Sequence, residues 1–485
     1  MREDCLVANV FVPQAAKADT KLPVLVIVHG GAYQFGSGSQ ETFRELANTK
    51  SKPVIVVTFN YRLGVHGFLC LGTEGAPGNA GLKDQVEFLR WVNTNIASFG
   101  GNPEDVTLAA CSAGSGSVDF LTLSSMTKGL FNKAIMESGV STGAVGVQID
   151  PMENAKYYAK LLDFSDVDDL KKLEEFYRTA SFQTLLSRHE VITNNQDVAI
   201  RFGPCVESDI GQERVVFNAP FNILQEGNYT KIPLMYGFTN MDGAMRLSFF
   251  ESWSDQMNKK FSDFLPAELH FDSEDKKEEV AQRVKQHYFG NEPVSEANIQ
   301  KYITYFTDVL FGYPILRSVS TRIEALGDTI YLFEYSFVDE NTSPAFPNTD
   351  IKGAYHCHQL IAVMDEDITD KTADYKTMKT ALRKFWHNFI LTGSPTSDTD
   401  EVKWQHTSAD RSPYMSLGTE IKMKDTQILG DRAAFWDAIY EEHYRGPVMP
   451  ETTTTPGDGA VSVVSSNVML LLVSISFYFT FYNFD

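Results

Sequence analysis

The sequence predicts an α/β fold, with a doubly wound, mostly parallel central sheet flanked by helices and large helical insertions. Two continuous runs of apolar, β-branched residues, 22–31 and 53–62, are typical of strands buried on both faces. Residues 80–99 carry apolar side chains at helical spacing. Strands that alternate with helices imply a parallel core. The 485 residues, 43% of them hydrophobic, suffice for one large α/β domain or two ordinary ones.

The other elements follow in chain order. Further strands are predicted at 106–110, 133–139, 232–238 and 329–337. The acidic, helix-rich stretches 150–224 and 252–311 are predicted to be insertions that cover the sheet. A helix at 379–391 and a helix that contains Trp436 close the domain.

Charge and cysteine content argue against some classes of function. The net charge is −21 and no basic patch stands out, which argues against a nucleic-acid partner. No C-x-x-C pair occurs, so a metal or redox motif is not expected. The odd number of cysteines leaves at least one thiol unpaired, or its partner missing, if the protein is secreted. The five cysteines are Cys5, Cys70, Cys111, Cys205 and Cys357.

The run DVTLAACSAGSGS predicts a nucleophile elbow at Ser112. A strand leads straight into the serine, and small residues that begin a helix follow it. The turn is so tight that the residues two before and two after the serine must be small. Here they are Ala110 and Gly114, so the expected G-x-S-x-G pattern is A-x-S-x-G.

A serine hydroxyl needs a base to take its proton and an acid to orient that base. In folds of this type the acid and then the histidine follow the serine along the chain. Asp242 lies in YGFTNMDG, just beyond the strand at 232–238, and His356 lies in DIKGAYHCHQL after the strand at 329–337. On pattern alone, Asp-Gly is usually a turn and a histidine is usually structural; His358 is the nearest rival for the base.

The segment HGGAY, residues 29–33, is the candidate oxyanion loop. Charge that develops on an oxygen needs preorganised N–H donors. The amides of Gly31 and Ala32, with that of Ala113 after the serine, would supply them. The alternative is a plain Gly-Gly turn after a strand.

The C-terminus has the order of a lipid-anchor signal. A threonine-rich stalk at 449–459 contains small residues, and a spacer and an apolar run of about 17 residues follow. We expect attachment at Asp458, with Gly457 or Gly459 as alternatives, and removal of 460–485. A single membrane-spanning helix and a buried core helix are the other interpretations. The main domain is expected over 1–448.

The N-terminus has no leader, although such an anchor is attached in the secretory lumen. We therefore expect the sequence to lack its upstream start. The sequons at Asn228 and Asn341 fit a lumenal route and would be glycosylated. The expected location is the outer face of the plasma membrane; a single-pass or a secreted protein is the alternative.

Several long strings resemble the type-B carboxylesterase and cholinesterase family, in particular insect-type carboxylesterases. They include EDCLVANVFVP, PVLVIVHGGAYQFGSG, FNYRLGVHGFL, GLFNKAIMESG and FWHNFILTGSP. The resemblance spans most of residues 3–445. It implies an α/β-hydrolase fold and maps the nucleophile to Ser112, the acid to Asp242 and the base to His356. It implies no cofactor and leaves a homodimer open.

The sequence departs from the family pattern at four points. Ala110 replaces the first elbow glycine. Cys111 replaces a polar residue that is often Glu, which weakens any case for a choline ester. Asp242 stands where the family usually has Glu, so its loop must approach His356 more closely. The family's N-terminal strands are absent, and Cys5 matches one half of a family disulfide whose other half would lie upstream.

Two functions remain at this point. The first is a serine carboxylic-ester hydrolase that acts on a small-molecule ester through an acyl-enzyme. The second is a non-catalytic, cholinesterase-like protein of the cell surface that serves in adhesion or in ligand scavenging. Members of that second kind usually lose the serine or the histidine, whereas this chain keeps all three candidates.

Overall fold

A computed structural model of the protein describes residues 4–450 apart from 15, 18, 41, 50–51, 189–195, 342–348 and 367. Its centre is a nine-stranded sheet in the order β1-β3-β2-β4-β5-β6-β7-β8-β9. All pairs from β3 to β8 are parallel, and β1 and β9 add one antiparallel strand at each edge. The strands from β3 to β8 in this order therefore all run in the same direction.

Most of the strands are short, and the strands in the middle of the sheet are largely buried. Their bounds are β1 Ala8–Phe11, β2 Leu22–Val28, β3 Ile55–Phe59, β4 Gly101–Cys111, β5 Lys133–Glu137, β6 Leu234–Thr239, β7 Ile330–Tyr335, β8 Tyr414–Leu417 and β9 Ile421–Lys424.

Helices make up most of the rest. The α-helices are α1 Arg44–Ala47, α2 Gly64–Phe68, α3 Ala80–Asn95, α4 Ala113–Leu123, α5 Pro151–Leu161, α6 Leu170–Thr179, α7 Phe182–Leu186, α8 Pro220–Glu226, α9 Phe250–Lys259, α10 Glu274–Phe289, α11 Ile299–Thr307, α12 Tyr313–Leu326, α13 His358–Val363, α14 Ala373–Thr392 and α15 Asp431–His443. Short 3₁₀ turns are η1 Ile96–Phe99, η2 Ser125–Thr127, η4 Asp242–Phe249, η5 Phe261–Phe264 and η6 Glu296–Asn298, and η7 Asp308–Gly312 is a π turn.

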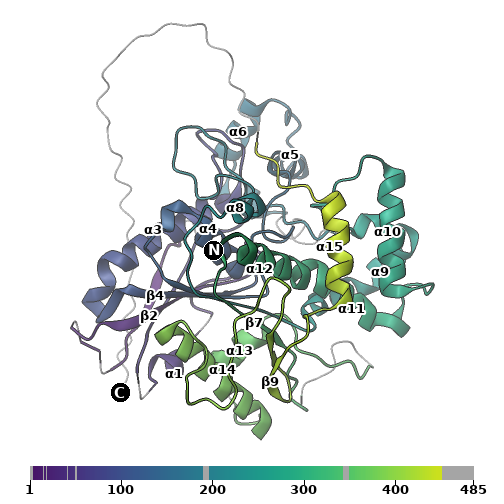
Figure 1. The fold of residues 1–485 in the computed structure, drawn as a ribbon. Coiled ribbons are helices and arrows are strands. Elements are labelled where there is room, and N and C mark those ends of the chain that lie inside the picture. The colour runs from purple at the N-terminus through teal and green to yellow at the C-terminus, as the bar shows by residue number, and fades with distance from the viewer. Residues whose placement is uncertain are drawn as a thin grey trace, which may run out of the picture.

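Helices cover both faces of the sheet, as Figure 1 shows. On one face α1, α13 and α14 enclose a core that contains Leu46, Leu360 and Trp386. On the other face α3, α4 and α12 enclose a larger core that contains Leu82 and Val118. Burial on both faces explains why the central strands are continuous apolar runs.

Strand β4 contributes side chains to both cores. Ala110 faces the α3/α4 core, whereas Ala109 and Cys111 face the α13/α14 core, as the two-residue period of a strand requires. The register sets Ala110 between Val28 of β2 and Met136 of β5. Cys111 is thus directed toward α13 and not toward the elbow helix.

The predicted fold class is confirmed, with shifts of a few residues at element ends. The helix expected over 80–99 is α3 followed by the 3₁₀ turn η1. Sequence reasoning missed the edge strands β1 and β9 and the neighbouring strand β8, because these four-residue strands lack a long apolar run. The expected anchor signal and nearly all of the stalk lie outside the described residues. Within the described part of the chain, no helix combines the length and apolar character needed to cross a membrane.

Candidate active site

Ser112 lies in a tight turn between β4 and α4. Its backbone has φ 62° and ψ −134°, which costs a non-glycine residue about 1–3 kcal/mol and persists only where the surroundings enforce it. The Ser112 N–H donates to the Glu137 carbonyl at 2.9 Å, and the Gly116 N–H donates to the Ser112 carbonyl at 3.0 Å. The structure therefore places this serine at a strand-to-helix elbow.

The elbow tolerates no side chain at some of its small residues. A Cβ at Gly114 would lie 2.2 Å from the carbonyl oxygen of Val28, and a Cβ at Gly139 would lie 2.2 Å from that of Ser112. Ala110 differs, because its methyl group is fully buried in the α3/α4 core. The chain thus accommodates the extra methyl group at the first small position, while the second must remain glycine.

Helix α4 starts directly after the serine and is buried along its whole length. Its first amides point toward the elbow, and the positive end of the helix dipole favours negative charge there. The nucleophile candidate is therefore carried by the most enclosed part of the fold and not by a surface loop.

Asp242 and His356 meet beyond the ends of two neighbouring strands. Asp242 begins η4 after β6, and His356 lies in the loop between β7 and α13. The distance from His356 Nδ1 to Asp242 Oδ1 is 2.7 Å, and the carboxyl group is fully buried. The acid is long enough to reach the histidine although it is one methylene shorter than Glu.

Two donors hold the other oxygen of Asp242. The Ser138 hydroxyl and the Thr239 N–H each donate to Asp242 Oδ2 at 2.9 Å. Because both oxygens are occupied, the carboxylate has a fixed orientation toward His356. Sequence reasoning missed Ser138, for which the signal was its place immediately after β5.

The structure distinguishes His356 from its rival. His358 is the first residue of α13, its ring packs 4.8 Å from that of Tyr355, and burial lowers its pKa. Only His356 of the two contacts Asp242. The sequence motif alone could not separate two histidines spaced by one residue.

The second ring nitrogen of His356, Nε2, is not the one that contacts Asp242. Nε2 is buried and makes no hydrogen bond to any described group. The ring stacks on Phe311 at 4.6 Å, and Phe311 and Ser112 line the same cavity. Such a nitrogen is available to accept a proton, and serine–histidine contacts often tighten only when substrate is bound.

The segment after β2 forms a strained loop beside the serine. Gly31, Ala32 and Tyr33 have φ values of 109°, 52° and 60°. A Cβ at Gly31 would lie 2.0 Å from the Phe35 carbonyl oxygen, so glycine is required there. Among the described residues, no backbone carbonyl accepts from the amides of Gly31, Ala32 or Ala113. These three N–H groups are therefore candidates to donate to an oxyanion that forms beside Ser112.

A cavity of about 270 Å³ contains the serine. Ser112, Ala32 and Ala113 form part of its wall, and the rest is mostly apolar. Apolar or aromatic residues of the wall include Phe35, Val140, Met245, Phe249, Leu310 and Phe311. A larger cavity of about 610 Å³ has a more polar wall and does not include Ser112. The smaller cavity is therefore the one that can hold a reacting group.

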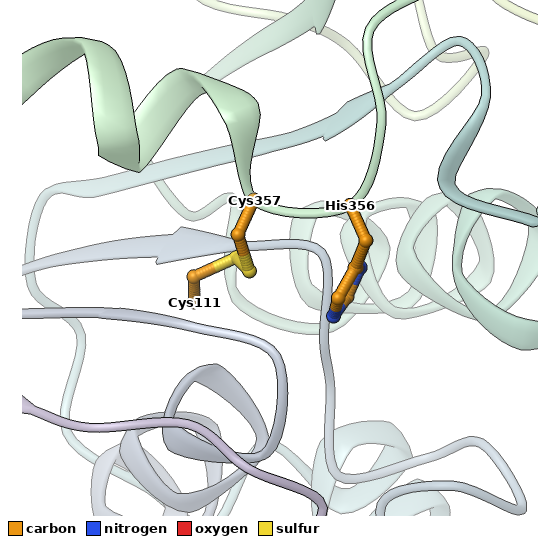
Figure 2. Close-up of side chains that lie close together, drawn as sticks. All are labelled: Cys111, His356 and Cys357. Atoms are coloured by element: carbon orange, nitrogen blue, oxygen red, sulfur yellow. A yellow bond between two sulfur atoms is a disulfide. The ribbon is translucent and has the colours of Figure 1, made fainter. Parts of the chain in front are cut away.

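Two disulfides are present in the described chain. Cys70 pairs with Cys205, and Cys111 pairs with Cys357, while Cys5 is in neither bond. Figure 2 shows the Cys111–Cys357 bond beside the His356 ring. The two sulfurs and a ring nitrogen lie within 4.8 Å of one another. Sulfurs that share a disulfide offer no thiolate, so this group is not a metal site while the bond is intact.

A family model described as "Carboxylesterase family" matches residues 1–436. The chain belongs to this family. As a carboxylesterase it is a serine hydrolase of carboxylic esters, which confirms the fold and the first of the two functions that the sequence predicted.

Individual relatives agree with this membership. The juvenile hormone esterase of Heliothis virescens is 32% identical over 82% of this chain and 72% of that protein. Venom carboxylesterase-6 of Apis mellifera is 28% identical over 90% of this chain and 80% of that protein. The crystal structure of juvenile hormone esterase from Manduca sexta with OTFP covalently attached has a TM-score of 0.80 and 29% identity. The similarity covers 91% of this carboxylesterase and 85% of that chain.

Proposed function

We propose that Ser112 is the nucleophile of this carboxylesterase, His356 its general base and Asp242 the group that orients the base. The observation that carries the proposal is the 2.7 Å contact between His356 Nδ1 and Asp242. With Nδ1–H donated to the carboxylate, Nε2 is the basic nitrogen, and it would take the proton of the serine hydroxyl.

The reaction would proceed through an acyl-enzyme. Ser112 Oγ attacks the ester carbonyl as its proton moves to His356, and the amides of Gly31, Ala32 and Ala113 stabilise the oxyanion. The alcohol leaves with the proton from His356. Water then attacks the acyl-serine, with His356 again as the base, and releases the acid. No cofactor takes part in these steps.

The cavity favours a small, largely apolar ester. Its walls are mainly apolar side chains, and its volume is about 270 Å³. Cys111, where a carboxylate often stands in the family, is directed into the α13/α14 core and offers no charge to a cationic alcohol. This argues against an ester of a cationic alcohol such as choline.

An organophosphorus probe tests the assignment directly. We expect the folded, full-length protein to take up one phosphonyl group on Ser112, located by peptide mass spectrometry. The Ser112→Ala protein should take up none. A folded wild-type protein that hydrolyses no ester and takes up no label would overturn the proposal.

Arg246 is expected to favour esters that carry an additional anionic group. It lines the cavity, is 6% exposed, and its guanidinium makes no ion pair among the described residues. Burial lowers its pKa to about 10, so it remains charged at neutral pH. Charged hydrogen bonds contribute about 1.5–3 kcal/mol. Arg246→Met should therefore lower kcat/KM about tenfold or more for an ester with a terminal carboxylate.

A neutral ester of the same length is the control substrate, and Arg246→Lys is the control variant. Arg246→Met should leave the neutral ester nearly unchanged, and Arg246→Lys should retain part of the preference. Equal losses on the two esters would instead assign Arg246 to the packing around η4.

The proposed location is extracellular, with a lipid anchor at Asp458. The name of the venom relative and the order of the C-terminal residues support it. Asn228 and Asn341, the proposed glycosylation sites, are both exposed. Phosphatidylinositol-specific phospholipase should release ester hydrolase activity from intact expressing cells. Retention on the cells would favour a membrane-spanning tail, and activity already in the medium would favour a secreted protein.

A further inference from the structure

The Cys111–Cys357 disulfide joins the residue before Ser112 to the residue after His356. The two cysteines are 246 positions apart in the sequence, and their Cα atoms are 6.0 Å apart. Figure 2 shows the bond next to the imidazole ring. One covalent link thus connects the strand of the candidate nucleophile to the loop of the candidate base.

The hydrogen bonds of His356 and Ala354 lead to the segment that holds the acid. His356 Nδ1 contacts Asp242, the Met241 N–H donates to the Ala354 carbonyl at 3.2 Å, and the Ala354 N–H donates to Asn240 Oδ1 at 3.1 Å. In the part of the chain that the structure describes, neither His356 nor Cys357 makes a hydrogen bond to residues 110–114.

Helix α13 brings one further contact to this strand. Gln359 Nε2 lies 4.0 Å from Cys111 Sγ and 3.3 Å from Ser138 Oγ. The first is a weak contact to a sulfur atom, and the second leads to the residue that holds Asp242. Beside the indirect route through Asp242 and Ser138, the disulfide is thus the direct, covalent link between the strand of the nucleophile and the loop of the base.

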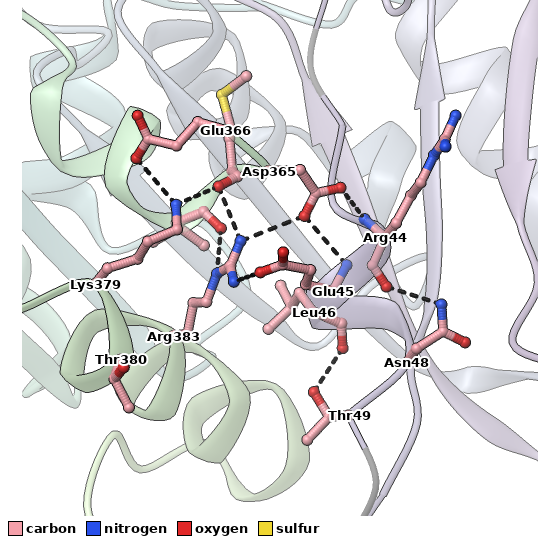
Figure 3. A network of polar contacts seen from close by, with 12 residues as sticks. Arg44, Glu45, Leu46, Asn48, Thr49, Asp365, Glu366, Lys379, Thr380 and Arg383 are labelled. Carbon is pink, nitrogen blue, oxygen red and sulfur yellow. Dashed lines mark hydrogen bonds and ion pairs between the residues drawn. The ribbon is translucent and has the colours of Figure 1, made fainter. Parts of the chain in front are cut away.

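The opposite end of α13 is fastened independently. Figure 3 shows the polar network around Lys379 and Arg383 of α14. Lys379 Nζ donates to the Ala362 carbonyl at 2.9 Å, and Arg383 Nε donates to the Val363 carbonyl at 2.8 Å. Asp365, just after α13, accepts from the Arg44 N–H of α1 at 2.6 Å.

Because α13 has this second attachment, the position of the His356 loop can change without detachment of the helix. The contacts in Figure 3 join the C-terminal end of α13 to α14 and α1 and do not involve the disulfide, so we expect them to persist when it is broken. Breaking the disulfide should therefore release the loop that holds His356 without detaching the helix. Loss of the disulfide should therefore lower the rate of the reaction while the fold persists.

We propose that the Cys111–Cys357 disulfide is a positioning element that fixes the loop of His356 relative to Ser112, so that its reduction lowers turnover. This inference rests on the proposed roles of those two residues. A misplacement of about 1 Å between reacting groups can cost about 100-fold in rate. The bond performs no chemistry on the ester.

A dithiol can reduce the Cys111–Cys357 bond by thiol–disulfide exchange. A thiolate of the dithiol attacks one sulfur, and the Cys111–Cys357 bond breaks to leave one cysteine thiolate and a mixed disulfide. The second thiol of the reagent closes its own ring and releases the other cysteine. The protein gains two thiols, and the dithiol is oxidised to its cyclic disulfide.

Removing each disulfide in turn tests the proposal. We expect Cys111→Ala/Cys357→Ala to lower kcat and the rate of organophosphorus labelling by about 10- to 100-fold, with KM little changed. The matched control is Cys70→Ala/Cys205→Ala, which deletes the other buried disulfide of the chain. It should lower the Tm and retain the wild-type kcat.

Dithiothreitol gives a second, reversible readout. It should lower kcat of the wild type and of the Cys70→Ala/Cys205→Ala control by the same factor, and reoxidation should restore both. It should leave Cys111→Ala/Cys357→Ala unchanged. Circular dichroism recorded on the same samples reports whether the fold persists.

Two results would overturn the inference. One is a wild-type kcat and pH profile in Cys111→Ala/Cys357→Ala. The other, decisive if that variant does not fold, is full activity of folded wild-type protein after mass spectrometry shows Cys111 and Cys357 reduced. Failure of the proposed function differs from both, because the oxidised wild type would then neither hydrolyse esters nor take up the probe.

Discussion

Ser112→Ala is expected to lower ester turnover by about 10⁶-fold, since loss of a serine nucleophile has a cost of this order in enzymes of similar chemistry. The methyl group cannot attack the carbonyl, so no acyl-enzyme forms. The fold should persist, because alanine fits any site that holds serine and the Ser112 backbone amide still donates to the Glu137 carbonyl. The measurement is kcat on a chromogenic short-chain ester, alongside the Tm.

Ser125→Ala is the matched control for this change. Ser125 is an exposed serine of η2, beyond the far end of α4. It should leave kcat unchanged. A kcat of Ser112→Ala within tenfold of the wild-type value would show that another residue is the nucleophile.

Asp242→Asn is expected to lower kcat by about 10⁴-fold, as when the acid of such a triad loses its charge while its shape is kept. The carboxylate accepts from His356 Nδ1 and holds the proton on that nitrogen. An amide in its place can donate to Nδ1, which would move the imidazole proton to Nε2 and remove the base. The measurement is kcat as a function of pH.

Asp242→Glu is the control that retains the charge. The longer side chain must fit a fully buried site whose other oxygen is held by Ser138 and Thr239. Its activity should lie between those of the wild type and Asp242→Asn. Equal activity of the Asn and Glu variants would mean that the charge of this residue does not assist the base.

The sequence indicated those parts of the site that depend on local chain geometry. A strand that enters a serine flanked by small residues predicts the position of Ser112, because only such residues fit between β2 and α4. Gly114 illustrates this, since any Cβ there would meet Val28. The order of acid and histidine after the serine made Asp242 a candidate and left His356 and His358 unresolved, and the family resemblance assigned the roles to Asp242 and His356.

Contacts between distant segments could not be predicted in this way. Five cysteines allow many pairings, and nothing local indicates that Cys111 lies opposite Cys357, 246 residues away. Ser138 was missed for the same reason, because its partner Asp242 is brought near only when β5 and β6 pair. The short edge strands depend on their neighbours as well, since four residues carry little periodicity of their own.

The burial of α4 bears on how this carboxylesterase can change during evolution. Every residue of the helix is enclosed, so almost any mutation there would disturb the nucleophile together with the core. By contrast, Phe35 and Met245 of the cavity wall are 61% and 41% exposed and lie on other segments. Selection can alter them at little cost in stability. Mutations at these exposed wall positions can therefore change which esters fit while the chemistry at Ser112 stays intact.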